Sequence, residues 1–416
     1  MPLALIALAI GAFGIGTTEF APMGLLPDIA GSLHTSIPTA GQLVSGYALG
    51  VLIGAPVMTA LGTRVARRPM LMLLMGLFVA GNVITALAPV YGLVLGGRLV
   101  TSLTHGAFFG IGAVVAAELV APARRAAAIS LMFSGLTLAN VVGVPLGTFV
   151  GQQLGWRTTF LLIAALGLAG LAGIATLVPR LPRPAGVRLR HETRALRNPQ
   201  VLLAMGMTVL GFGGVFTAVT YLAPLMTTVA GYPPGAVMWL QVLFGAGMVA
   251  GNLLGGRLAD RRLMPTLLVA LAALAVVLGA FTLTGHTRIG AAVTVALIGA
   301  LGFTTVPPLQ KRIIDTAPAA PTLASAVNIG AFNLGNAIAA ALGGLVISAG
   351  FGYPAATVVG AAMAAGALLL AVVSVLLDRR SGRTEPTGSR EPEPATAALR
   401  APNPDADPSP LGPASA

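Results

Sequence analysis

The chain has 416 residues, of which 56% are hydrophobic and only 9% are charged, and its mean hydropathy is +0.89. This balance excludes an ordinary soluble globular protein and predicts a polytopic membrane protein. The absence of cysteine excludes disulfides and thiolate chemistry, and the four scattered histidines make no metal-binding motif, so we expect neither a metal nor another cofactor.

Apolar runs of about 20 residues, long enough to cross a membrane as helices, recur along the sequence. Their continuous apolarity, without alternation of period two, favours helices over a β-barrel. The first run lacks a basic segment ahead of it and is longer than the core of a signal peptide, so we expect it to span the membrane. The twelve predicted helices cover residues 3–26, 39–61, 69–88, 91–119, 126–150, 158–178, 201–226, 236–258, 265–284, 289–310, 322–348 and 353–377.

The formal net charge of +12 suggests nucleic-acid binding, but the basic residues are distributed by loop. Alternate loops hold three Arg at 64–68, two at 124–125, six at 180–197, three at 257–262, and Lys311 with Arg312; the other loops hold only Arg157 and Arg288. This asymmetry follows the positive-inside rule and predicts a plasma-membrane protein with both termini in the cytoplasm. The basic excess then reflects topology and contact with anionic lipids of the bilayer, not nucleic acid.

A long polar stretch at residues 179–199 divides the chain into two predicted bundles of six helices, residues 1–178 and 200–377. The tail, residues 378–416, is rich in Pro, Ser, Glu and Ala, and we expect it to be disordered. Sliding the chain by 197 residues superposes similar residues in five of the six helices. The pairs include Gly14 with Gly211, Pro27 with Pro224, and Arg64 with Arg261. Such repeats are typical of transporters with a substrate site between the halves.

Four stretches of the sequence carry a recognisable pattern: "FGIGTTEFAPMGLLPDIA", "TALGTRVARRPML", "GRLVTSLTHGAFFGIGAVV" and "ANVVGVPLGTFVGQQLGWRTTF". Together they resemble the major facilitator superfamily, and within it the group of drug:proton antiporters and sugar (arabinose) efflux permeases. The resemblance covers residues 1–380. It implies an all-α membrane protein of twelve transmembrane helices in two pseudo-symmetric bundles, acting as a monomer on a small-molecule substrate and protons.

Glu19 stands in an apolar run, where an unpaired charge costs roughly 2.5–3.5 kcal/mol. Counted from Leu26 at the predicted end of its helix, Glu19 lies about 10 Å deep, and Arg98 lies equally deep counted from Tyr91. We therefore expect the two side chains to be neighbours. A change of this contact would let Glu19 take up and release a proton; the alternative is a static ion pair. The resemblance also implicates Arg98 in proton transfer.

Helical spacing places Thr101, Ser102 and His105 on one polar stripe after Arg98, with Phe109 nearby. His105 titrates near neutral pH and is a candidate proton relay. It also suits a simpler role, as a hydrogen-bonding group in a cavity.

Two further motifs point to function through the resemblance. "GTRVARR", with Arg64, Arg67 and Arg68, and "GGRLADRR", with Asp260 and Arg261, resemble the signature that latches the cytoplasmic ends of the helices. The first copy has Thr59, Thr63 and Ala66 in place of Gly, Asp and Gly, and loss of the acid puts a standard latch in that half in doubt. The arginines also serve as topology determinants.

"NVVGVPLGT" resembles the motif of antiporters and favours export. Its residues are Gly143, Pro145 and Gly147. The proline removes an N–H and kinks the helix, while the glycines allow close packing. A kink without meaning for direction is the alternative.

Amides and aromatic residues on the inner faces of the predicted helices suit an amphipathic organic ligand. The candidate cavity residues are Met23, Gln42, Phe109, Asn140, Phe216, Tyr221, Gln241, Asn328, Phe332 and Asn336. Each of them also suits plain interhelical packing.

The sequence therefore predicts a proton-coupled efflux transporter of drugs, sugars or secondary metabolites that works by alternating access. A proton-coupled importer on the same scaffold is the first alternative. A membrane enzyme is disfavoured, because the short outer loops offer little beyond Asp28, His34 and His286. A non-transporting sensor would be expected to carry a large soluble domain.

Overall fold

The computed structural model describes residues 3–62, 64–180, 198–318 and 321–380. Among these residues, twelve helical segments are long and apolar enough to cross a membrane, as the sequence predicts. Most of the predicted linker, residues 181–197, and most of the tail, residues 381–416, lie outside the described residues. Residues 378–380, predicted to begin the tail, instead form the last turn of the final helix.

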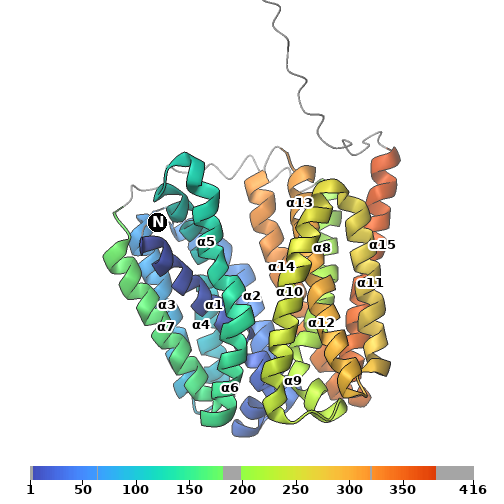
Figure 1. Cartoon of the computed structure of the whole chain (residues 1–416). Helices are drawn as coiled ribbons and strands as arrows, with labels where there is room; N and C mark the ends of the chain where they lie inside the picture. Colours follow the sequence, from blue (N-terminus) through green and yellow to red (C-terminus); the bar gives the residue numbers. More distant parts are fainter. Residues whose placement is uncertain (1–2, 63, 181–197, 319–320, 381–416) are drawn as a thin grey trace, which may run out of the picture.

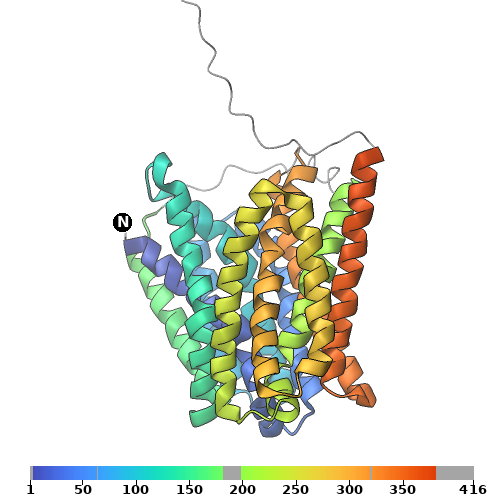
Figure 2. The same cartoon turned by 45° about the vertical axis from the view of Figure 1, so that its right-hand side comes forward.

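The helices form two bundles, the N-half and the C-half, which stand side by side (Figures 1 and 2). The N-half consists of α1 (Leu3–Ser32), α2 (Ile37–Gly62), α3 (Arg67–Leu87), α4 (Tyr91–Glu118), η1 (Pro122–Arg124), α5 (Arg125–Leu138), the π-helical turn η2 (Ala139–Gly143), α6 (Val144–Leu154) and α7 (Trp156–Leu177). The C-half consists of α8 (Pro199–Thr220), α9 (Leu222–Pro224), η4 (Leu225–Val229), η5 (Pro234–Ala236), α10 (Val237–Arg261), α11 (Leu263–Thr284), α12 (Arg288–Thr304), α13 (Val306–Thr316), α14 (Pro321–Val346), η6 (Ile347–Phe351) and α15 (Pro354–Arg380).

The two halves repeat the same packing, in agreement with the duplication in the sequence. In the N-half α2 packs on α4, and in the C-half α10 packs on α12; α3 on α7 corresponds to α11 on α15 in the same way. Gly247 and Gly251 of α10 lie so close to the α12 backbone that a Cβ on either would overlap it. Their repeat counterparts, Gly50 and Gly54, face α4 as closely. Small residues permit this approach where lipid gives no hydrophobic drive to association.

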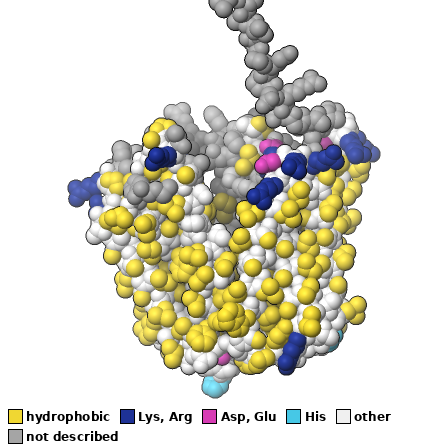
Figure 3. All heavy atoms as spheres, viewed as in Figure 1, with side chains coloured by type: hydrophobic (Ala, Val, Ile, Leu, Met, Phe, Trp, Pro, Cys, Tyr) yellow, Lys and Arg dark blue, Asp and Glu magenta, His cyan; other side chains and the backbone are white. Residues whose placement is uncertain are grey.

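Charge marks the two ends of the molecule. We call the end where α1 begins and α15 ends the basic end, because most of the described arginines lie in the helix ends and loops there; Arg157 and Arg288 lie in those at the opposite end. Hydrophobic side chains cover the surface between the two ends (Figure 3). The apolar belt suits the acyl chains of a bilayer, with the charges at the two interfaces.

The halves touch where α2 packs on α14, where η2 and α6 pack on α10, and where α1 packs on α9. At the opposite end, the Gln152 side chain donates a hydrogen bond of 3.1 Å to the carbonyl of Pro234 across this boundary. Near the middle of the helices, Gly245 lies against the backbone of Asn140, and Gly330 lies against Leu52. Toward the basic end the halves diverge (Figure 1), and the surface is hollowed between them (Figure 3).

Candidate functional site

Helix α1 has a gap in its own hydrogen bonding in the middle of the N-half. Pro22 lies inside the helix and has no N–H to donate to the carbonyl of Thr18, four residues earlier. Arg98 of α4 supplies the missing donor: its Nη1 lies 2.6 Å from the Thr18 carbonyl oxygen and 3.2 Å from the Thr18 hydroxyl oxygen. The proline thus creates the acceptor that the buried guanidinium needs.

Aromatic rings complete the surroundings of Arg98, whose side chain is only 1% exposed. The guanidinium carbon lies 4.3 Å from the centre of the Tyr47 ring and 5.9 Å from that of Phe160. Stacking on a ring stabilises a guanidinium that has little access to water. Its Nε has no hydrogen-bond partner among the described residues.

Glu19 and Arg98 are neighbours, as the sequence predicts, but their contact runs through the backbone. Arg98 Nη2 lies 3.4 Å from the carbonyl oxygen of Glu19. The Glu19 carboxylate faces His105, with Oε2 3.9 Å from Nδ1, and the Glu19 side chain is 13% exposed. Tyr47 completes the group, because its hydroxyl lies 3.2 Å from the same Nδ1. We call Glu19, Tyr47, Arg98 and His105 the polar cluster.

The predicted end of the first helix is wrong, because α1 continues to Ser32 instead of ending at Leu26. Glu19 lies 13 residues before that end, or about 20 Å along the helix axis, near its middle. Pro27 lies inside the helix, and Asp28 follows it within the last two turns.

The stripe predicted on α4 divides among different neighbours. Thr101 packs on Gly81 of α3, and Ser102 packs on Gly50 of α2. His105 alone of the three belongs to the polar cluster. Phe109 does lie near it, with ring centres 5.2 Å apart, and stacks on Phe133.

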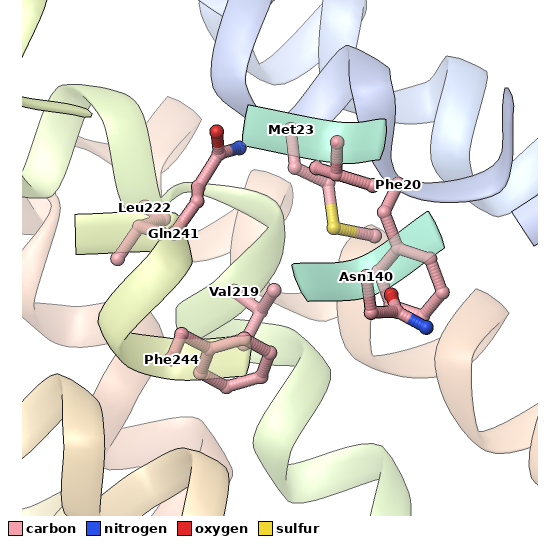
Figure 4. A pocket seen from close by; sticks show the side chains of 8 residues that line it. Phe20, Met23, Asn140, Val219, Leu222, Gln241 and Phe244 are labelled. Carbon is pink, nitrogen blue, oxygen red and sulfur yellow. The ribbon is translucent and has the colours of Figure 1, made fainter. Parts of the chain in front are cut away.

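A small pocket opens at the boundary between the halves (Figure 4). Its free volume is about 20 Å³ in this conformation, enough for one or two water molecules. Among the predicted cavity residues, Met23, Asn140 and Gln241 lie on its wall. The lining residues are Phe20, Met23, Asn140, Val144, Val219, Leu222, Gln241 and Phe244.

Other predicted cavity residues do not line this pocket. Phe216 lies just beside it, with its ring centre 5.6 Å from that of Phe20. Gln42 and Tyr221 lie at the contact of α2 with α14, where Tyr221 packs on glycines of both helices and its hydroxyl donates to the carbonyl of Ala340 over 2.8 Å. Both suit a packing role.

The remaining three predicted cavity residues lie on α14. Asn328 is buried, accepts from the Thr208 hydroxyl over 2.8 Å and donates to Gln310 over 2.8 Å. Phe332 stands at a right angle to Phe212, with ring centres 4.9 Å apart. The Oδ1 atom of Asn336 is buried and accepts no hydrogen bond from the described residues.

The predicted latch residues make their contacts within one half. Arg67 pairs with Glu118 at the end of α4. Arg68 donates to the carbonyl of Ala175 in α7. In the second motif Asp260 lies 3.5 Å from Lys311. Arg64 and Arg261 are exposed at the basic end.

The motif with Pro145 coincides with a π-helical turn, η2, immediately before it. Pro145 cannot donate to the backbone four residues earlier, and the N–H of Val144 bonds to the carbonyl of Ala139, five residues back. Gly143 then fits against Phe13 and Thr17 of α1, while Gly147 fits against Thr159 of α7. The expected close packing is present, and α1 is one of the partners.

Comparison with known proteins agrees with this geometry. A sequence profile described as Major Facilitator Superfamily matches residues 8–329. The chain belongs to the major facilitator superfamily. Among superfamily members, the "Inner membrane transport protein YdhP" of Escherichia coli (strain K12) is 49% identical over 370 residues, which cover 89% of this chain and 95% of that protein. A "Chloramphenicol resistance protein" of Streptomyces lividans is 35% identical, over 85% of this chain and 90% of that one.

A solved structure has the same fold as this chain. A crystal structure of a bacterial homolog of the human lysosomal transporter Spinster, described as inward-facing and unoccupied, matches with a TM-score of 0.70 over 92% of this chain and 98% of that one. At 17% identity this match shows the fold alone. As a member of the superfamily whose relatives include an inner membrane transport protein, the chain is a multi-pass membrane transporter and not an enzyme.

Tyr47 and Thr18 are functional candidates that the sequence analysis missed. A hydroxyl-bearing aromatic residue in the middle of an apolar run would have singled out Tyr47. The pattern Thr-x-x-x-Pro at residues 18–22 would have indicated an unpaired carbonyl at Thr18.

Proposed function

We propose that this protein exports small organic molecules from the cytoplasm in exchange for protons, with Glu19 as the proton-binding group. The observation that carries the proposal is the position of the Glu19 carboxylate: it lies near the middle of α1, faces His105, and is held beside a buried arginine. Ionisable groups at such depth are costly and mark functional sites in membrane proteins.

The positive-inside rule assigns the basic end to the cytoplasm, with both termini on that side. The hollow toward the basic end then corresponds to an inward-facing state. The name of the relative YdhP favours the inner membrane, and that of the chloramphenicol resistance protein favours export. We expect the monomer to be the transporting unit, because both walls of the pocket come from one chain.

Proton exchange follows from the surroundings of Glu19. In an outward-facing state the carboxylate accepts a proton from outside, and the substrate leaves. After the halves rock, the proton departs to the cytoplasm and a new substrate binds. Ionised Glu19 is stabilised by the positive charge of Arg98 and favours the His105 tautomer with an N–H on Nδ1, which faces the carboxylate at 3.9 Å; protonated Glu19 lacks that preference, and Nδ1 is then able to accept from the Tyr47 hydroxyl. The two protonation states thus favour different hydrogen-bond arrangements.

The test is transport of chloramphenicol into everted membrane vesicles that carry an imposed proton gradient. Wild type is expected to accumulate chloramphenicol, and Glu19→Gln to lose gradient-driven accumulation while keeping exchange of chloramphenicol between equal pools. The matched control is Asp28→Asn, which removes an exposed acid at the outer end of the same helix and is expected to behave as wild type.

Gradient-driven accumulation by Glu19→Gln at the wild-type rate would refute the assignment of the proton site. Proton-driven uptake by intact cells, without accumulation in everted vesicles, would indicate an importer instead.

A further inference from the structure

The pocket between the halves has no charged residue on its wall. Six of its eight lining side chains are apolar, and the other two are the amides of Asn140 and Gln241. The Gln241 side chain extends toward the helix that carries Met23 (Figure 4). Its Oε1 is buried and accepts no hydrogen bond from the described residues. A ligand that enters as the pocket widens therefore meets an acceptor in need of a donor.

The C-half side of the boundary is aromatic. Phe212 is the centre of a group of rings, with its own centre 5.3 Å from Phe216, 5.4 Å from Phe303 and 4.9 Å from Phe332. Phe216 extends this group to Phe20 of the N-half, on the pocket wall. Rings in contact favour edge and offset arrangements that a ligand ring can join.

The 197-residue repeat shows how the two halves differ at this level. The positions that correspond to Glu19, Tyr47 and Arg98 are occupied by Phe216, Phe244 and Val295. The N-half thus holds a charged, hydroxyl-bearing cluster where the C-half holds aromatic and apolar groups. A ligand between them contacts two chemically different walls.

The charged side chains of the polar cluster compensate each other, so neither is available to pair with a charged ligand. With Glu19 ionised and His105 neutral, the charges of Glu19 and Arg98 cancel; with Glu19 protonated, the cluster is positive. A cationic ligand then has no uncompensated carboxylate to pair with among the described residues at this depth. An anionic ligand fares no better, because Arg98 is buried against the Thr18 carbonyl and the Tyr47 ring.

We infer that the substrates are uncharged molecules that carry an aromatic ring and a hydroxyl or amide N–H. The ring packs on the side of Phe216 and Phe244, and the donor binds Gln241. This inference rests on the proposed export function and narrows it to a substrate class.

Three probes separate this inference from its alternatives in everted vesicles under a proton gradient. Chloramphenicol is neutral and aromatic and carries hydroxyl and amide donors. Ethidium is aromatic and permanently cationic, and arabinose is neutral and has no aromatic ring. Chloramphenicol is expected to accumulate at least about tenfold above both other probes. Ethidium would bury an unpaired charge, whose free-energy cost is far larger than that of a tenfold change in affinity, and arabinose has no aromatic ring to pack on Phe216 and Phe244.

Accumulation of ethidium or arabinose at the rate of chloramphenicol would overturn the inference while leaving proton-driven export standing. Accumulation of none of the three would count against both the inference and the proposed function.

Variants of the wall supply a second, independent readout. Phe244→Leu is expected to raise the half-saturating concentration of chloramphenicol by about threefold to tenfold through loss of ring contact. Gln241→Leu is expected to raise it by about tenfold, because the ligand donor loses its acceptor. The control is Phe281→Leu, which removes a ring of the same size buried in α11, away from the pocket, and should leave the value unchanged once folding is verified. Equal effects of all three variants would refute the assignment.

Discussion

Arg98 donates a hydrogen bond to the backbone carbonyl of Thr18 over 2.6 Å, in the place where an unbroken helix would use the N–H of residue 22. The Arg98 guanidinium thereby replaces the N–H donor that α1 lacks at Pro22, and it also lies beside Glu19. The two roles can be tested separately.

Replacement of Arg98 by lysine keeps the charge but removes the planar group that reaches both carbonyls and stacks on Tyr47. Because a charge-assisted hydrogen bond contributes roughly 1.5–3 kcal/mol, we expect proton-driven efflux to fall by about tenfold or more. Arg288→Lys is the matched control, since Arg288 also donates to a backbone carbonyl, that of Gly231, but at the exposed opposite end. Wild-type efflux by Arg98→Lys would show that charge alone suffices.

Pro22→Ala restores an N–H that competes with Arg98 for the carbonyl of Thr18. The helix gains its own hydrogen bond, so the melting temperature is not expected to fall, yet efflux is expected to decrease because Arg98 loses its anchor. Pro27→Ala, one and a half turns further along the same helix, is the control and should leave efflux unchanged. A variant Pro22→Ala with full efflux would mean that the anchor is dispensable.

Arg312 stabilises the basic end of the C-half. It is 8% exposed and donates to Gln200 over 3.1 Å, to Ser374 over 2.8 Å and to Asp378 over 2.5 Å. We expect Arg312→Gln to lower the free energy of unfolding by about 3 kcal/mol, because it breaks a largely buried ion pair with Asp378 and removes two further hydrogen bonds. The neighbouring Lys311→Gln breaks only an exposed pair and should change it by less than about 1 kcal/mol. Thermal unfolding of the purified protein measures both, and equal shifts would contradict the prediction.

The contact of Gln152 with Pro234 allows the motion of the halves to be tested directly, because the chain has no native cysteine. A Gln152→Cys/Pro234→Cys double variant, joined by a short bifunctional thiol reagent with a reducible spacer, is expected to stop transport until reductant is added. The control pair, Ser36→Cys/Thr39→Cys, joins two neighbours within the N-half and should not affect transport. Undiminished transport by the joined Gln152–Pro234 pair would exclude opening of the halves at that end.

The number of helices and their approximate ranges were predictable from hydropathy, because a membrane imposes the same length on every spanning segment. The end of α1 was not, since Pro27 and Asp28 look like a stop signal although the helix continues to Ser32. Hydropathy reports where the chain enters lipid, and a helix is free to extend beyond that point.

The sequence predicted which residues belong to the candidate site better than it predicted which side chains they contact. Glu19 and Arg98 are neighbours as predicted, although the depth was counted from a wrong helix end, and Met23, Asn140 and Gln241 do line the pocket. Spacing along one helix does not identify the helix across from it, so the sequence did not show that the Glu19 carboxylate faces His105 or that Tyr221 packs between α2 and α14.

Pro22 in α1 also constrains which substitutions the chain can accept in evolution. Loss of Pro22 alone leaves a guanidinium competing for an occupied acceptor, and loss of Arg98 alone strands a carbonyl in the protein interior. Either single substitution leaves a donor or an acceptor without its partner, whereas the present pair and an ordinary helix lacking both residues satisfy the Thr18 carbonyl. We therefore expect Pro22 and Arg98 to be kept or replaced together among related chains.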